Sequence, residues 1–404
     1  MLNVFAIVTC LLCQSAPVDI TKYAPVYSEQ GKHPWDSVHE SFFVRRFSTG
    51  ETYYHRLSFD VPSGFRRFSS SDADYRALLD LLVKVEQLPK QEMEDAAPVR
   101  RMIFYRDLWT TFEALKNMAS KERGEELRRH LARIMKRLEL TNDEIQRLPD
   151  TLSRVRATSA FPETPDPEHP EIPFLPTNLL SDSSDWIAIS TSKKSAMGAP
   201  GHMSSVNQRS LFSIHMHSPL GRKSGEEFIA ANSKQSSFAF PPGTQLALLR
   251  RAVMANDQGK LKVTNVVESL QLLVTPPAEA KSDARVKFVL DRSSFLAGQP
   301  GLIPLQRNSP VDAYSFESAG QWMMVVGKDS DGETLVLGRG KGHVGVPSMQ
   351  HCAACHGIQN RNFHANFGQF SVYKSSNADL ATTLERHLEE SVAWHEYLQF
   401  RETP

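Results

Sequence analysis

This chain of 404 residues has no net charge, few cysteines and hardly any long apolar run. The 46 basic and 46 acidic side chains cancel to a formal charge of zero. Such a chain has no long-range field to steer it to a phosphate backbone, so no nucleic-acid partner is expected. Beyond the N-terminus no stretch approaches the ~18 consecutive apolar residues of a membrane span. Four cysteines do not make a disulfide scaffold, and the length is enough for two or three globular domains.

The extreme N-terminus holds the chain's longest apolar segment. Residues 4–12 are apolar, and small residues follow before Pro17. This order is typical of the apolar part and cleavage region of a secretory signal, so residues 1–16 are interpreted as a signal segment. No basic residue precedes the run, and the alternatives are a buried N-terminal strand or a lipid anchor at Cys13.

Residues 72–150 are predicted to form three to five helices, within a helical domain that spans residues 17–158. Thr141 and Glu144 form a capping box, and the short helix that follows ends near Leu148 because Pro149 cannot continue it. Apolar residues recur at helical spacing in three stripes, which are Leu78, Leu79, Leu82 and Val85; Leu108, Phe112 and Leu115; and Leu127, Leu131, Ile134 and Leu138.

A proline-rich connector is predicted over residues 159–207, because six prolines fall between Phe161 and Pro176. Short β-branched and apolar runs then alternate with turn residues and predict a β-rich domain over residues 208–345. The expected strands are Trp186–Ile189 in the connector, then Leu211–His215, Gln245–Met254, Lys260–Val274, Val286–Leu290, Trp322–Val326 and Thr334–Leu337, with one helix at Ser224–Asn232.

His215 and His217 alternate on one of these expected strands and therefore face the same side. A metal ion could use two imidazoles in this arrangement. A partly exposed strand face without a metal is the preferred interpretation.

The most informative segment is His351-Cys352-Ala353-Ala354-Cys355-His356-Gly357. A C-x-x-C-H string is the attachment signature of c-type haem, and chance alone produces it in roughly one chain per thousand of this composition. If the string forms one helical turn, both thiols lie on one face and can each add to a haem vinyl group. Cys352 and Cys355 are therefore predicted to anchor one covalent haem c, with the His356 imidazole as an axial ligand of the iron.

Three other interpretations of the string stay open. A thioredoxin-type C-x-x-C would follow a strand in a βαβ unit, and no such unit is predicted here. A zinc site could combine Cys352 and Cys355 with His351 and His364, but no second ligand pair of suitable spacing follows. A structural disulfide would leave His356 unexplained.

The second axial ligand is ambiguous, because no methionine follows His356. His364 is the first choice, and the remaining candidates are His387, His395, Met323, Met324 and Met349. His387 and His395 are eight residues apart and are expected on one face of a C-terminal helix. An open, five-coordinate iron is equally admissible and would allow peroxide chemistry or the binding of small ligands.

Several motifs resemble those of a group of uncharacterised exported bacterial proteins that also end in a C-x-x-C-H segment. The resemblance covers roughly residues 140–360, and its motifs are Leu140–Ile145 with Leu148–Asp150, Phe174–Pro176 with Trp186, Pro241–Arg250, Asp257–Gly259, Glu268–Gln271, and Phe295–Gly298 before Gly301. It implies that Cys352, Cys355 and His356 are haem anchors and that the protein is exported. It implies no substrate. A wider resemblance to cytochrome c-like mono-haem proteins depends on the C-x-x-C-H residues alone.

The sequence thus predicts an α+β protein with an N-terminal helical bundle, a β-rich middle domain and a short cytochrome c-like haem segment over residues 346–404. The expected function is one-electron transfer to an unidentified redox partner, in the periplasm or after secretion. One alternative is a haem-dependent oxidoreductase, peroxidase or sensor with open iron coordination. Another is a binding or scaffold protein with a zinc or thiol site.

Overall fold

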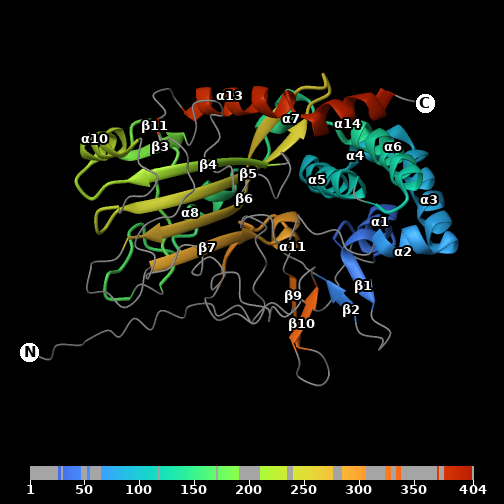
Figure 1. Ribbon diagram of the computed structural model, residues 1–404, viewed down its shortest axis with the longest axis horizontal. Coiled ribbons are helices and arrows are strands. Elements are labelled where there is room, and N and C mark those ends of the chain that lie inside the picture. The colour runs from blue at the N-terminus through green and yellow to red at the C-terminus, as the bar shows by residue number, and fades with distance from the viewer. Residues whose placement is uncertain are drawn as a thin grey trace, which may run out of the picture.

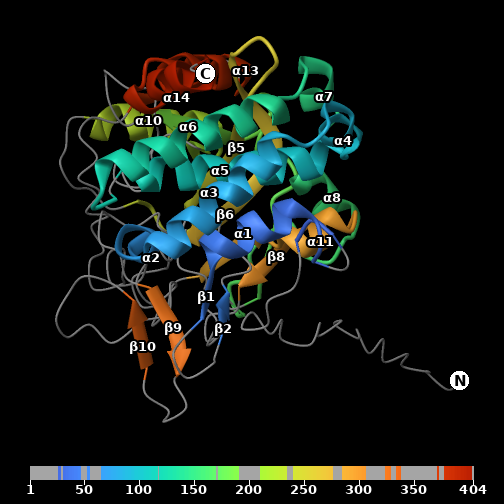
Figure 2. The ribbon, with the colours of Figure 1, turned by 90° about the vertical axis from the view of Figure 1, so that its right-hand side faces the viewer.

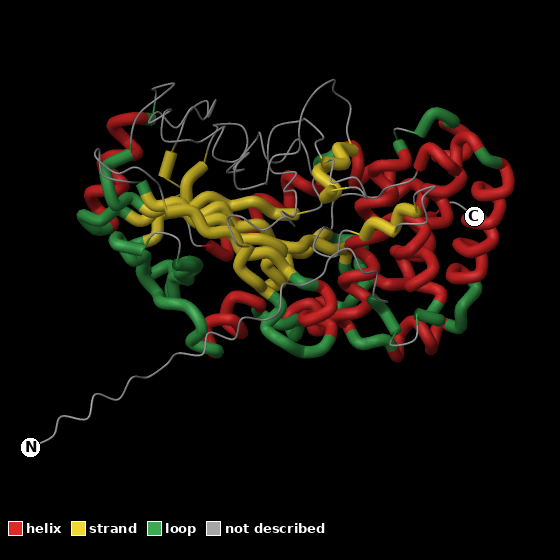
Figure 3. Tube along the Cα trace, turned by 90° about the horizontal axis from the view of Figure 1, so that it is seen from below, coloured by secondary structure: helices red, strands yellow, loops and turns green. Residues whose placement is uncertain are grey.

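The computed structural model describes residues 26–28, 31–46, 52–54, 65–116, 118–169, 172–190, 210–233, 240–275, 284–305, 324–328, 334–337, 371–372 and 377–402. Helices gather at one end of the molecule and an antiparallel sheet lies at the other (Figures 1 and 3). The predicted α+β class is confirmed. No helix among these residues is long and apolar enough to cross a bilayer.

The helical end is built around α5 (Pro98–Leu115), which is buried on nearly every side (Figure 2). Pro98 begins this helix in its first turn, where the missing amide costs no hydrogen bond. The surrounding helices are α1 (Pro34–Phe43), α2 (Phe65–Ser70), α3 (Asp72–Glu86), α4 (Lys90–Asp95) and α6 (Lys121–Leu138). A small hairpin of β1 (Val44–Arg46) and β2 (Thr52–Tyr54) follows α1.

The apolar stripes read from the sequence fall on α3, α5 and α6, and all of their residues except Leu79 are buried. The capping box is confirmed at the start of α7 (Asn142–Gln146), where Thr141 and Glu144 exchange side-chain bonds with each other's backbone amides. The sequence analysis missed α8 (Thr151–Ala157). Pro149 ends one helix, but the Asp150 carboxylate accepts a bond from the Ser153 amide and caps the next.

The main sheet has seven strands in the order β11-β3-β4-β5-β6-β7-β8, and every neighbouring pair is antiparallel. The strands are β3 (Trp186–Ser190), β4 (Ser210–His217), β5 (Gln245–Ala255), β6 (Leu261–Val274), β7 (Ala284–Leu290), β8 (Leu302–Leu305) and β11 (Ser371–Val372). The predicted strands match β3 to β7 within a few residues. The sequence analysis missed β8, which contains Pro304 and lies at the edge, where a strand tolerates proline.

Three shorter elements accompany the sheet. Helix α10 (Arg222–Asn232) packs against β3 and β4 and confirms the helix predicted there. Helix α11 (Arg292–Leu296) follows β7 directly, and β9 (Met324–Lys328) pairs with β10 (Thr334–Leu337) in a separate hairpin.

One hydrophobic core connects the bundle to the sheet. The β5–β6 turn docks on the chain between α6 and α7, where the Asp257 amide donates to the Leu140 carbonyl oxygen at 3.0 Å. Phe174, Leu175 and Leu179, from the predicted connector, are buried in the same core. Phe161 also meets Phe288 of β7 edge to face at 5.1 Å, and the many prolines of this segment fit the absence of helix between residues 158 and 169.

Candidate functional site

The predicted haem anchors Cys352, Cys355 and His356 lie outside the described residues, as do His364, Met323 and Met349. The structure does describe the elements on either side of them. The last described residue before the motif is Leu337 at the end of β10, and the first after it is Ser371 in β11. Ser371 pairs with Ser190 at the edge of the main sheet. The chain therefore returns to the folded body a short distance after the motif.

Helix α13 (Asn377–Glu389) covers an open edge of β6. β7 pairs only with the second half of β6, from Ser269 onward, which leaves backbone amides free in the first half. Glu389 and Glu385 accept bonds from the amides of Leu261 and Val263, each at 2.9 Å. Two carboxylates one turn apart on a helix have nearly the same spacing as two amides that are two residues apart on a strand. The helix can therefore bind this strand edge in place of a neighbouring strand.

Helix α14 (Val392–Glu402) packs its aromatic residues into the helical bundle. The Trp394 ring stacks on Trp109 of α5 with centroids 5.6 Å apart, and Tyr397 stacks on the same ring at 5.8 Å. Glu396 of α14 also lies 2.7 Å from Arg128 of α6. Helices α13 and α14 run along the sheet and the bundle in turn (Figure 1), so the chain after the motif belongs to the main body.

The expectation that His387 and His395 share one face of a single helix is wrong. The helix ends at Glu389, and Ser391 starts α14 by accepting a bond from the Trp394 amide at 3.1 Å. The His395 side chain is exposed, with Nδ1 2.7 Å from the Ser391 carbonyl oxygen. Because a carbonyl oxygen can only accept, Nδ1–H is the donor in this contact. Metal-binding histidines commonly show this arrangement.

His215 and His217 each contact a neighbouring side chain of the protein. His215 is buried rather than partly exposed, and its Nε2 lies 2.9 Å from the Ser213 hydroxyl. Burial lowers the pKa of His215 to about 3, so the imidazole is neutral. His217 packs against Trp186. No group of three or more histidine, cysteine, aspartate or glutamate side chains is arranged to hold a metal within the described ranges.

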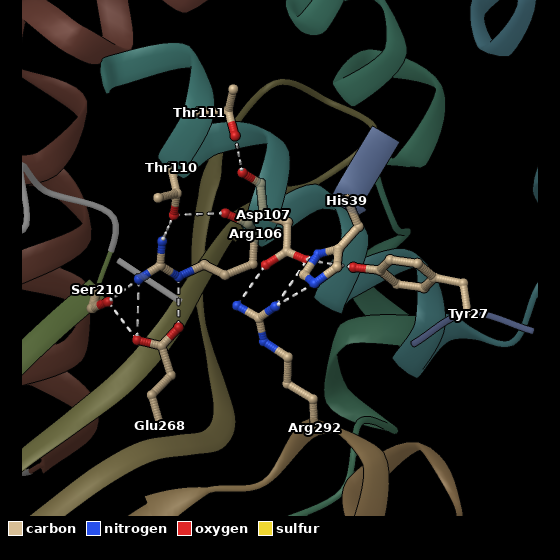
Figure 4. Close-up of polar contacts among 9 residues, drawn as sticks. All are labelled: Tyr27, His39, Arg106, Asp107, Thr110, Thr111, Ser210, Glu268 and Arg292. Carbon is tan, nitrogen blue, oxygen red and sulfur yellow. Dashed lines mark hydrogen bonds and ion pairs between the residues drawn. The ribbon is translucent and has the colours of Figure 1, made fainter. Parts of the chain in front are cut away.

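Sequence analysis missed a network of buried charges between α5 and the sheet (Figure 4). Its first half is centred on Glu268 of β6. This carboxylate lies 2.5 Å from Arg106 of α5 and 2.8 Å from Arg250 of β5, and it accepts the Ser210 hydroxyl at 2.5 Å. A buried carboxylate is stable only with such complete pairing, so this half fixes the position of α5 on the sheet.

The second half of the network is centred on Asp107, the next residue of α5 (Figure 4). Its Oδ2 accepts the Tyr27 hydroxyl at 2.6 Å and lies 2.8 Å from His39 Nδ1, while Arg292 Nη2 lies 2.8 Å from Oδ1. Burial raises the pKa of Asp107, but Arg292, His39 and the Tyr27 bond outweigh it, so the pKa falls below its ordinary value. Asp107 is therefore a buried carboxylate anion.

His39 completes this half as a neutral imidazole. Burial lowers its pKa despite the attraction of Asp107, and its Nε2 faces Arg292 Nη1 at 3.5 Å. Nδ1–H therefore donates to Asp107, and Nε2 faces a cation. An aspartate and a histidine in contact suit acid–base catalysis, but His39, Asp107 and Arg292 are almost completely buried and offer no access to a substrate. The arrangement instead ties α1 and the chain near Tyr27 to α5 and α11.

Comparison with known proteins adds no relative to this description. No family model, no curated protein and no solved structure matches the chain. The functional residues are therefore assigned from the chemistry of the chain itself.

Proposed function

We propose that this protein binds one haem c covalently through Cys352 and Cys355, with His356 as an axial ligand of the iron, and that it transfers single electrons. The observation that carries the proposal is the C-x-x-C-H string. The residues present have the required chemistry, because two thiols can each form a thioether with a vinyl group and an imidazole can bind iron. The haem supplies the one-electron couple.

The elements around the motif support this proposal. β10 ends before the motif, and β11, α13 and α14 pack on the sheet and bundle after it. The chain after the motif is thus anchored to the folded body, so its candidate ligand His395 has a fixed position on α14. The long apolar segment at residues 4–12 supports export, which would bring the thiols to the compartment where haem is attached.

His364 remains the first candidate for the second axial position, and His395 is the second. His395 is exposed, and its Nδ1–H donates to the Ser391 carbonyl oxygen, which fixes the ring as in many metal-binding histidines and supports this second choice. Because no methionine follows His356, an open iron is the alternative. In that case the protein is a haem-dependent oxidoreductase, peroxidase or sensor.

The proposal is tested on protein made with a cytochrome c maturation system. A pyridine haemochrome spectrum of the c type is expected, and it should vanish in the Cys352→Ala, Cys355→Ala double variant. The matched control is the Cys10→Ala, Cys13→Ala variant, which should keep the spectrum. Colourless wild-type protein that contains one zinc ion would refute haem binding and support the zinc alternative.

The spin state of the iron separates electron transfer from catalysis. Low-spin, six-coordinate iron supports electron transfer, and the variant His364→Ala or His395→Ala that turns it high-spin identifies the second ligand. High-spin iron in the wild type that binds carbon monoxide or reacts with peroxide supports the oxidoreductase or sensor.

A further inference from the structure

A buried tyrosine of α14 has both a proton acceptor and an aromatic path beside it. Tyr397 is fully buried, and its hydroxyl donates to Glu139 Oε1 at 2.7 Å. Burial raises the pKa of Tyr397 well above its ordinary value, so the phenol keeps its proton at neutral pH. A phenol gives up an electron easily only if its proton leaves at the same time. The hydrogen-bonded Glu139 carboxylate can accept that proton.

Glu139 is suited to accept this proton. Burial raises the pKa of its carboxyl group to about 7, although Tyr397 and Arg401 oppose the shift. Arg401 Nη1 lies 2.5 Å from Oε1, and Arg401 Nε lies 3.0 Å from the Glu402 carboxylate. Protonation of Glu139 therefore leaves Arg401 with a second anionic partner. Arg401 therefore stays paired with Glu402 when Glu139 is neutral.

The electron has a path through stacked rings. The rings of Trp109 and Trp394 are 5.6 Å apart and inclined by only 19°. The Trp109 ring also stacks on Tyr397 at 5.8 Å, and Tyr105 meets Tyr397 edge to face at 6.4 Å. Closely packed indoles and phenols pass an electron vacancy between them over such distances. Trp109, Trp394 and Tyr105 are buried, so the path is shielded from water.

We propose that Tyr397 is a redox-active residue that gives one electron through Trp109 and Trp394 to a strong one-electron oxidant and its proton to Glu139. The O–H bond of the phenol breaks and an O–H bond forms on the carboxylate. The tyrosine becomes a neutral radical, Glu139 becomes a carboxylic acid, and the oxidant is reduced by one electron. The natural oxidant would be of the class that peroxide generates at an iron porphyrin. Only this last assignment rests on the proposed function, and specifically on its open-iron alternative, because a six-coordinate iron leaves peroxide no position to bind.

Tyr27 provides a comparison within the same protein. Its hydroxyl also donates to a buried carboxylate, that of Asp107, at 2.6 Å. Asp107 already has His39 and Arg292 as partners, and these hold its pKa below the ordinary value, so it is a poor proton acceptor. Tyr27 should therefore stay reduced when Tyr397 is oxidised.

The test uses flash photo-oxidation of the full-length protein with tris(bipyridine)ruthenium(III), followed by freeze-quenching and electron paramagnetic resonance. The wild type should give a tyrosyl radical. The signal should disappear in Tyr397→Phe and persist unchanged in Tyr27→Phe. In Glu139→Gln the radical should form about a hundredfold more slowly, because the proton acceptor is lost.

A Trp394→Phe variant retains an aromatic ring in the core and provides a second test, because the Trp394 ring lies 5.2 Å from Tyr397 and 5.6 Å from Trp109. It should slow radical formation in protein whose circular dichroism matches the wild type and which is fully folded at the temperature of the measurement. A tyrosyl signal that survives in Tyr397→Phe or disappears in Tyr27→Phe would overturn the proposal. The Cys352→Ala, Cys355→Ala protein should give the same radical. A failure of haem attachment is thus distinguishable from a failure of this inference.

Discussion

Replacement of Asp107 by Asn removes the charge at the centre of the buried network and leaves the shape of the side chain almost unchanged. Three donors converge on this carboxylate, from Tyr27, His39 and Arg292. The neutral amide offers one acceptor oxygen and places a donor group among the others. Arg292 is completely buried, so the change removes its ion pair with Asp107 inside the protein.

The expected cost is large. Breaking a buried ion pair by removing one partner costs roughly 3–5 kcal/mol, a large share of the ~5–15 kcal/mol by which a typical domain is stable. Urea unfolding followed by circular dichroism measures the change. The matched control is Glu94→Gln, because Glu94 pairs with Lys90 one turn away on an exposed helix face. That pair contributes only about 0.3–0.5 kcal/mol.

A double-mutant cycle with Arg292→Met tests the physical cause. If loss of the buried Asp107–Arg292 ion pair causes the destabilisation, Asp107→Asn should cost much less when Arg292 is already methionine. A loss below about 1 kcal/mol for Asp107→Asn alone, or strict additivity of the two changes, would refute the assignment of this network as an essential ionic link.

Three further predictions concern other parts of the structure. The pKa of His215 is lower in the folded protein than its ordinary value of 6.5, so the stability it provides is complete above pH 6.5 and is lost as the pH falls toward about 3. Urea unfolding between pH 7 and pH 4 should show a smaller loss in His215→Gln than in the wild type. Trp394→Ala should cost about 3–5 kcal/mol in thermal unfolding, whereas Val392→Ala, at an exposed position, should cost almost nothing; equal effects would contradict the docking of α14. Glu385→Gln with Glu389→Gln should speed hydrogen exchange of the two β6 amides they bind by about tenfold, and unchanged exchange would contradict the edge cover.

The regular elements were predictable where a single period runs through the sequence. The stripe Leu127–Leu138 lies on α6, and β6 begins one residue after the expected Lys260 and ends at the expected Val274. Helix α1 was not predicted. This helix has only ten residues, so it depends on contacts with residues that are distant in the sequence. One such contact is the stacking of Trp35 on Phe104, with ring centroids 4.6 Å apart.

The candidate site residues also differ in whether the sequence alone predicts them. The C-x-x-C-H string can be read without the fold, because its chemistry is contained in five consecutive residues. The buried network was not predictable, since Arg106 and Glu268 are 162 positions apart and Asp107 and Arg292 are 185 apart. The sole local signal was the charged pair Arg106-Asp107 inside the otherwise apolar run Met102–Trp109. Such a pair indicates burial with partners but does not identify them.

The most direct test of covalent haem binding is the intact mass of the mature protein after cytochrome c maturation, with mapping of the peptide that contains Cys352 and Cys355. We predict the mass of the polypeptide plus one haem, with the added mass on that peptide. A mass equal to that of the bare polypeptide, from cells that mature a control cytochrome c normally, would contradict the proposed function.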